Sequence, residues 1–480
     1  MRINRTQLIF LLPSAMLCTA ANAQWSGTYA IGAFANAVAI ATDSTIYAVG
    51  GNLNAVAPVL IHVDSEGDTI ETRTFEWAWR AGRSGGLHAV TDGSWLMAGS
   101  SADSIAKAAV FKFNPLLDSI QMVLLDTSEF WHLTSLDVAS DSSILVFGET
   151  QAPADIGMMR LSPQLQVLDS VRYVTAPSET CSNGIATLDN GFAIASIRVL
   201  SATDYDVHVV KADATGNIQW QRSIGDDWYE LGGFIAQSSD SNYYVACGYR
   251  WPNVLYSRST LVQLNSVGIP QWYCVVPTIG SSWLLTKPVI TGNGRILAAG
   301  KSILNGYYRG HLMCADTAGT LLWERVYATD TMDHNAILDM QQHSAGGFVL
   351  VGQAVDTQTS VDRPWVVRTD SMGCLVPGCD LINGITEQRT DLANALAVSP
   401  NPTRDIVQVS IHLPDGLVQH DELLLTLMDV HGRPVQEERV RGSSTIQALS
   451  LSLSPLSPGI YFLHLTSGAS WFAGTRIVKQ

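Results

Sequence analysis

The sequence predicts an all-β protein, with a seven-bladed β-propeller followed by a small C-terminal β-sandwich. Three observations lead to this fold class. An apolar, β-rich segment recurs about every fifty residues, polar turns containing Gly separate the segments, and only 15% of the chain is charged. This composition suits many short strands and turns better than long surface helices.

Seven copies of the apolar segment define the repeat. Their last residues are separated by 49, 49, 48, 52, 52 and 52 residues. A unit of about fifty residues is the size of one four-stranded propeller blade. The copies are Ile46–Gly50, Leu96–Gly99, Ile144–Gly148, Phe192–Ser196, Tyr244–Gly248, Ile296–Gly300 and Phe348–Gly352.

The same signals follow one another in each unit. A polar turn such as Asp189–Gly191 leads into the apolar segment, and an alternating strand comes next. A second turn then follows, such as Asp213–Gly216, where Asp can cap the turn and Gly can adopt a positive φ. In three units a Trp comes four residues after this Gly, at Trp220, Trp272 and Trp323. The continuous apolar segments indicate strands buried on both faces, between blades.

The two ends of the repeat region are complementary. Trp25–Ala30 resembles the Trp strand of a unit, and the seventh unit breaks off after Gly373. We therefore expect the first strand to complete the last blade, which removes exposed sheet edges. An open solenoid is the competing fold. The predicted propeller spans residues 24–379, and a polar linker spans residues 380–395.

The N-terminus carries the features of a secretory signal peptide over residues 1–23. Arg2 and Arg5 precede an apolar run, and small residues occupy Ala21–Ala23. Removal of this segment changes the formal net charge from −15 to −17. Such an acidic chain is a poor candidate for nucleic-acid binding. No later apolar run approaches the ~20 residues needed to span a bilayer, so we do not expect a membrane-spanning protein.

Six cysteines follow the signal peptide, and an oxidising compartment permits disulfides. We predict a bridge between Cys374 and Cys379, which bracket a Pro-Gly turn. A metal site is the weaker alternative, because no second pair or nearby His completes a ligand set. The sequence does not determine whether the other four cysteines pair with one another or are buried free thiols. They are Cys181, Cys247, Cys274 and Cys314.

Residues 396–480 carry a second set of motifs. An SPNPT sequence opens the segment, Gly459–Leu465 reads GIYFLHL, and Arg476–Gln480 is basic and aliphatic. In combination they resemble the C-terminal sorting domain of type IX secretion cargo in Bacteroidetes. The residues that carry the resemblance are Pro400, Asn401, Pro402, Gly459, Tyr461 and Lys479. The resemblance implies a β-sandwich recognised by the type IX secretion machinery, export through the periplasm, and a secreted or surface-attached product. It implies nothing about activity.

The candidate ligand-binding residues lie 16–20 residues before the ends of the apolar segments, where propeller loops converge on the central channel. Aromatic rings there can stack on sugars or peptide side chains, and polar groups can orient hydroxyls or amines. The alternative is that the Trp side chains only pack between blades. The candidates are Arg83, Trp131, His132, Glu179, Trp228, Trp283, Asp333 and His334.

No catalytic, metal or cofactor site is predicted. Gly82–Gly86 matches the G-x-S-x-G pattern, but a strand rather than a helix follows it. The His residues form no H-E-x-x-H motif. The Trp repeats faintly resemble the tryptophan-docking motif of quinoprotein propellers, and we interpret them as blade packing. We predict an exported protein that binds an extracellular glycan or protein. The alternatives are a polysaccharide-acting enzyme that uses Glu179, Asp333 and His334, or a surface scaffold.

Overall fold

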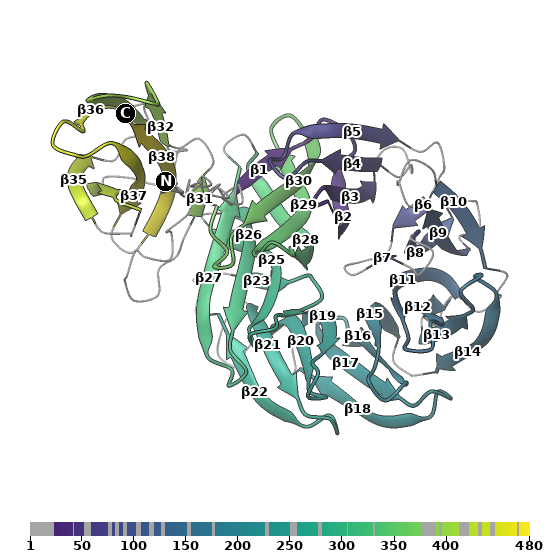
Figure 1. Cartoon of the computed structure of the whole chain (residues 1–480). Helices are drawn as coiled ribbons and strands as arrows, with labels where there is room; N and C mark the ends of the chain where they lie inside the picture. Colours follow the sequence, from purple (N-terminus) through teal and green to yellow (C-terminus); the bar gives the residue numbers. More distant parts are fainter. Residues whose placement is uncertain are drawn as a thin grey trace, which may run out of the picture.

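The computed structural model shows a ring of β-sheets with a smaller pair of sheets beside it (Figure 1). It describes residues 24–41, 43–51, 59–74, 79–81, 86–89, 94–101, 107–114, 120–125, 130–150, 155–174, 178–225, 230–249, 257–276, 281–304, 306–329, 332–375, 390–392, 396–411, 422–430, 434–441, 447–467 and 470–480. Every regular element in these ranges is a strand. The same ranges hold no helix that could cross a membrane.

The ring consists of seven sheets in the described part of the chain, and each sheet corresponds to one sequence repeat, whose own strands pair antiparallel. Blade 1 holds β2 (Phe34–Ile40), β3 (Ile46–Gly51), β4 (Val59–Val63) and β5 (Thr69–Thr74); blade 2 holds β6 (Trp79–Ala81), β7 (Leu87–Ala89), β8 (Trp95–Ser101), β9 (Ala108–Phe113) and β10 (Ile120–Leu124). Blade 3 holds β11 (Phe130–Val138), β12 (Ile144–Thr150), β13 (Ile156–Leu161) and β14 (Val167–Tyr173); blade 4 holds β15 (Glu179–Ala186), β16 (Phe192–Ser201), β17 (Asp204–Ala212) and β18 (Ile218–Ile224).

Blade 5 holds β19 (Leu231–Gln237), β20 (Tyr243–Tyr249), β21 (Arg258–Leu264) and β22 (Pro270–Val275). Blade 6 holds β23 (Ser282–Leu284), β24 (Val289–Ile290), β25 (Ile296–Leu304), β26 (Tyr307–Ala315) and β27 (Leu321–Ala328). Blade 7 holds β28 (His334–Gln342), β29 (Phe348–Asp356), β30 (Val361–Thr369) and β1 (Trp25–Thr28). The all-β, propeller-type architecture expected from the repeats is confirmed.

The recurring Gly of the repeat lies where two strands come unusually close. A Cβ atom at Gly50 would lie 1.8 Å from the Phe34 carbonyl oxygen, and one at Gly352 would lie 1.9 Å from that of Ala336. The strand opposite each of these glycines is bulged at this point, between Ala35 and Ala37 in blade 1 and likewise in blade 7. The repeat ends in Gly because a side chain would collide with the bulged strand.

The first strand closes the ring, as the sequence predicts. β1 pairs antiparallel with β30, with Trp25 opposite Arg368 and Thr28 opposite Trp365. The Trp365 Nε1 donates a hydrogen bond of 2.8 Å to the Ser26 hydroxyl. Blade 7 therefore takes its fourth strand from the opposite end of the chain.

The repeated Trp residues join neighbouring blades. A Cβ atom added to Gly268 of blade 5 would lie 2.5 Å from the Trp220 ring of blade 4. The Trp220 Nε1 donates a 3.0 Å hydrogen bond to the Ser266 carbonyl in the same turn. The other Trp residues repeat this contact, with Trp25 on Gly67, Trp272 on Gly319 and Trp323 on Gly373. These contacts support the blade-packing interpretation of the motif.

The hydrophobic core of the ring lies between adjacent blades. In one buried cluster, Leu297 and Leu312 of blade 6 pack with Ile337, Leu350 and Trp365 of blade 7. Such layers explain why the apolar segments are continuous rather than alternating, since both faces of the strand are covered.

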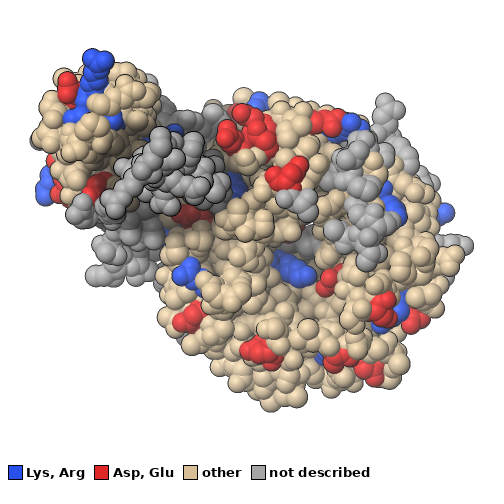
Figure 2. Space-filling model, viewed as in Figure 1, with Lys and Arg blue, Asp and Glu red and all other residues tan. Residues whose placement is uncertain are grey.

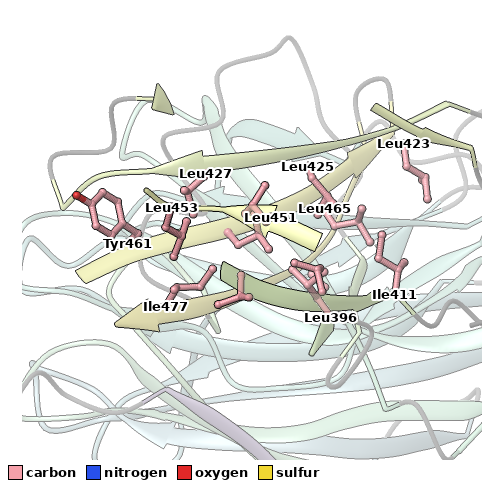
Figure 3. Packing of buried hydrophobic residues seen from close by; sticks show 14 of the residues in the cluster. Leu396, Ile411, Leu423, Leu425, Leu427, Leu451, Leu453, Tyr461, Leu465 and Ile477 are labelled. Carbon is pink, nitrogen blue, oxygen red and sulfur yellow. The ribbon is translucent and has the colours of Figure 1, made fainter. Parts of the chain in front are cut away.

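The C-terminal domain is a sandwich of two sheets around one apolar core (Figure 3). One sheet holds β32 (Leu396–Ser399), β33 (Ile406–Ile411) and β36 (Gln447–Ser452); the other holds β34 (Glu422–Met428), β35 (Pro434–Arg441), β37 (Gly459–Ser467) and β38 (Ser470–Lys479). The Leu423, Leu425 and Leu427 side chains alternate into this core. The alternation is the period of a strand with one buried face.

The sequence motifs at the two ends of this domain meet in space. The Asn401 amide donates to the Arg476 carbonyl at 2.7 Å and accepts a 2.8 Å hydrogen bond from the Val478 N–H. The buried Lys479 ammonium donates to the carbonyls of Leu453 and Leu456 at 2.6 and 2.5 Å. Gly459 begins β37, the Tyr461 hydroxyl donates to the Ser457 carbonyl, and Pro400 and Pro402 flank Asn401.

Part of the predicted linker forms a strand. β31 (Thr390–Leu392) pairs in parallel with β27 at the outer edge of blade 6. Ala328, at the end of β27, belongs to the same buried cluster as the sandwich core. Residues 1–23 lie outside the described ranges, and so does Cys379. The signal peptide and the Cys374–Cys379 bridge therefore stay predictions.

Candidate functional site

A cluster of aromatic and basic side chains spans blades 6 and 7, and we call it the blade 6–7 cluster. Its members are Trp283 on β23, Lys301 on β25, Tyr307, Tyr308 and Arg309 on β26, Asp333 just before β28, and His334 at its start. Strand pairing brings them together. Trp283 lies opposite Lys301, and the hairpin of β25 and β26 folds Tyr307 and Tyr308 back over the same end of the blade.

Lys301 lies between two aromatic rings. Its Nζ is 4.3 Å from the centroid of the Tyr308 ring and 5.5 Å from that of the Trp283 ring. Burial lowers the pKa of Lys301, with no opposing contribution from a carboxylate. The negative faces of the rings stabilise the ammonium instead, as in other cation–π contacts. Lys301 takes part in no ion pair within the described part of the chain.

His334 packs against both tyrosines. Its ring centroid is 4.9 Å from that of Tyr308 and 5.7 Å from that of Tyr307. The Tyr308 N–H donates a 2.9 Å hydrogen bond to His334 Nδ1. Because Nδ1 accepts this bond, the proton of the neutral imidazole resides on Nε2, which is then a donor.

Hydrogen bonds hold the Asp333 and Arg309 side chains in place at the edge of the cluster. The Asp333 carboxylate accepts hydrogen bonds from the backbone N–H and the hydroxyl of Thr357. Burial alone would raise the pKa of Asp333, but these hydrogen bonds outweigh it and lower the pKa. The buried Arg309 donates to the Asp333 carbonyl at 2.5 Å, and its guanidinium lies 5.2 Å from the Tyr307 ring centroid.

Three of the eight predicted site residues therefore meet: Trp283, Asp333 and His334. Sequence reasoning missed Lys301, Tyr307, Tyr308 and Arg309. For Tyr307, Tyr308 and Arg309 the signal was the Tyr-Tyr-Arg sequence directly after Asn305-Gly306, which predicts aromatic and basic side chains at the start of a strand.

Glu179 occupies a different environment, in blade 4. It is fully buried, and its carboxylate contacts Arg198 at 2.6 Å, His208 at 3.1 Å and the Ser196 hydroxyl at 3.0 Å. Burial alone would raise the pKa of Glu179, but His208 and Arg198 outweigh it and lower the pKa to about 2. Glu179 is thus a buried counter-ion rather than a surface group.

The remaining predicted residues are only partly described. His132 is half-buried on β11, opposite Glu149 of β12. Trp131 precedes it at an irregularity of the strand pairing, between Phe130 and His132. Arg83 and Trp228 lie outside the described residues.

One buried arrangement has the composition of a hydrolytic triad. The Ser259 hydroxyl lies 3.2 Å from His311 Nδ1, and His311 Nε2 lies 3.2 Å from Glu324. The Ser259–His311 contact links blade 5 to blade 6. All three side chains are buried and are therefore inaccessible to a substrate. In the described ranges no group of His, Cys, Asp or Glu side chains is arranged to hold a metal ion.

Four of the described cysteines are buried: Cys181, Cys247, Cys274 and Cys314. Burial raises the pKa of Cys274 to about 11 and that of Cys314 to about 12. Cys274 and Cys314 are therefore protonated at neutral pH and poor nucleophiles.

Residues 397–480 match the family described as the secretion system C-terminal sorting domain. No curated protein matches the chain. Among solved structures, the β-propeller domain of the trilobed protease from Pyrococcus furiosus is 9% identical, with a TM-score of 0.42 over 70% of this chain and 98% of that one. The polysaccharide lyase Uly1 is 10% identical, with a TM-score of 0.46 over 75% and 94% of the two chains. A protein of unknown function from Bacteroides caccae is 13% identical, with a TM-score of 0.38 over 58% and 90%.

Likenesses this remote carry no argument about what the chain binds or does. The family match, in contrast, agrees with the motifs that meet in the sandwich. Residues 397–480 are a type IX C-terminal sorting domain, and the protein that carries it is secreted or held at the outer surface of the cell.

Proposed function

We propose that this protein is an exported β-propeller that binds an extracellular glycan through the blade 6–7 cluster. The observation that carries the proposal is a gathering of four rings at one end of a blade. Trp283 and Tyr308 contact Lys301, and His334 contacts both Tyr308 and Tyr307. Tyr307 is 40% exposed and offers a ring for stacking. Sugar sites combine such rings with a few fixed polar groups.

The other predicted residues extend the proposed site. Arg83, Trp131, His132 and Trp228 precede or begin inner strands of other blades, and we propose them as further ligand contacts. Glu179 has an indirect part in this proposal, because it holds the partly exposed Arg198 side chain.

An enzyme acting on polysaccharide has less support. The Glu179 carboxylate is buried among its partners, and the Asp333 carboxylate is occupied by Thr357. Neither is placed as a free acid or base facing a substrate.

Retention on immobilised polysaccharides and extracellular proteins tests the proposal, with the chain from residue 24 to 480. Tyr307→Ala should weaken retention about tenfold or more, a loss of ~1.4 kcal/mol. Tyr273→Ala is a matched control, because Tyr273 is 39% exposed on the outer strand of blade 5. Released product would favour an enzyme. Absence of both retention and product would favour a scaffold.

A further inference from the structure

The unpaired polar groups of the blade 6–7 cluster are donors. Lys301 carries a half-buried positive charge that contacts the Trp283 and Tyr308 rings and forms no ion pair with a described residue. Two further N–H groups, Trp283 Nε1 and Arg309 Nε, are buried and have no hydrogen-bond acceptor among the described residues. A buried unpaired donor costs ~1–3 kcal/mol, so such groups are rare and call for an explanation.

The acceptor atoms of Asp333 and His334 Nδ1 already receive hydrogen bonds. Both Asp333 carboxylate oxygens accept hydrogen bonds from Thr357. The Asp333 carbonyl accepts from Arg309, and His334 Nδ1 accepts from Tyr308. The cluster therefore carries one more positive than negative charge, from Lys301 and Arg309 against Asp333, and two buried donors that no described group accepts.

This local excess contrasts with the chain as a whole, whose formal net charge is −15. On the face drawn in Figure 2, acidic and basic side chains are both scattered around the ring, and basic atoms also appear near its centre. A general attraction for anions is not expected of such a protein, so an anion would have to be bound locally.

We propose that the blade 6–7 cluster binds an acidic sugar unit of a glycan, with Lys301 as the counter-ion of its carboxylate or sulfate group. Tyr307 projects from the opposite face of the β25–β26 hairpin, and we propose that it stacks on a neighbouring sugar unit of the same glycan. This inference rests on the proposed function and specifies its ligand class. The half-buried position strengthens the attraction between Lys301 and an anion relative to a fully solvated pair. The stacked ring favours a sugar over an acidic polypeptide, which offers no flat apolar face at each unit.

The test compares matched acidic and neutral polymers. The chain from residue 24 to 480 is titrated with polygalacturonate and its fully methyl-esterified form, and with dextran sulfate and dextran. The first pair measures the effect of a carboxylate group on binding, and the second pair measures the effect of a sulfate group. We expect at least about tenfold tighter binding to one acidic member, and this preference should weaken as salt is raised.

Variants at Lys301 test whether this residue causes the preference for acidic over neutral glycans. Lys301→Met should reduce the acidic-to-neutral ratio to about one, and Lys301→Arg should retain most of it. Lys107→Met is the matched control, because it removes the same charge from an exposed position of blade 2 and should change nothing. Unchanged thermal unfolding of Lys301→Met would show that the variant is folded.

The outcomes separate the two proposals. Equal binding of acidic and neutral glycans, unaffected by Lys301→Met, would overturn the acidic-sugar inference and leave glycan binding intact. Binding to none of the glycans would overturn both. Binding to polyglutamate but to no glycan would assign the cluster to an acidic polypeptide instead.

Discussion

The buried Glu179 carboxylate lies beside the one position where the repeat lacks its glycine. In blade 4 the apolar segment ends in Ser196 rather than Gly, and the Ser196 hydroxyl donates to the Glu179 carboxylate. Arg198 and His208 complete the contacts. A buried carboxylate is tolerated only where charges and donors surround it, and here neighbouring strands of one sheet supply them.

We expect Glu179→Gln to lower the free energy of unfolding by about 3 kcal/mol at pH 7, because it leaves Arg198 without its counter-ion. The folded pKa of Glu179 is about 2, below its ordinary 4.5. Its stabilisation is therefore full above about pH 4.5 and is lost as the pH falls towards 2. The difference between wild type and variant should shrink over that range.

Denaturant unfolding at pH 7 and pH 2.5 measures this difference. The control is Glu66→Gln, at an exposed turn position, which should change stability by less than about 0.5 kcal/mol. An equal loss for Glu179→Gln at both pH values would contradict the electrostatic explanation.

At the scale of elements, the turn between the third and fourth strands of a blade receives the Trp of the preceding blade. In blade 5, the Asn265 side chain accepts the N–H groups of Val267 and Ile269 and fixes the turn. Gly268 completes it with φ +77° and lies under the Trp220 ring. The turn geometry and the contact between blades thus depend on the same residue.

Gly268→Ala should lower the free energy of unfolding by roughly 1–3 kcal/mol, because the new methyl meets both a positive φ and the indole. Gly292→Ala is the control, since a Cβ there meets nothing within 4 Å and its φ is not positive. Thermal or denaturant unfolding provides the comparison. Similar losses at the two positions would contradict the docking role of Gly268.

At the scale of the whole molecule, the ring depends on a strand from the far end of the chain. Deletion of Trp25–Thr28 leaves β30 with an unpaired edge and removes the Trp25 contact with the blade 1 turn. We expect a large fall in melting temperature and faster proteolysis of blade 7. Trp25→Phe, which keeps a ring but loses the indole donor, should cost only about 1 kcal/mol. An unchanged melting temperature after the deletion would mean that the ring does not need this closure.

Export depends on the other end of the chain. Removal of residues 396–480 deletes the sorting domain and leaves β31 available to pair with β27. We expect the truncated protein to remain in the periplasm with its propeller folded. Cell fractionation measures its location, and the circular dichroism and melting of the purified protein verify its fold. Normal surface delivery of the truncated chain would refute the role of this domain.

The sequence by itself determined the architecture and the export route. The architecture depends on local properties of the sequence, namely strand periodicity, turn residues and the spacing of the apolar segments. The same signals occur in every repeat, which makes them easy to recognise. The first strand was predictable for the same reason, because Trp25–Thr28 has the pattern of a fourth strand with no blade of its own. The sorting motifs were readable because they occur together within one short segment.

The tertiary structure decided which side chains act together. Lys301 meets Trp283 through strand pairing and Tyr308 through a hairpin, and nothing local in the sequence marks it as a site residue. Glu179, grouped with the surface candidates by its position in the repeat, is instead buried by residues of β16 and β17. Repeats fix the backbone, whereas a site arises from the few side chains that differ between repeats and from the burial that only packed blades impose.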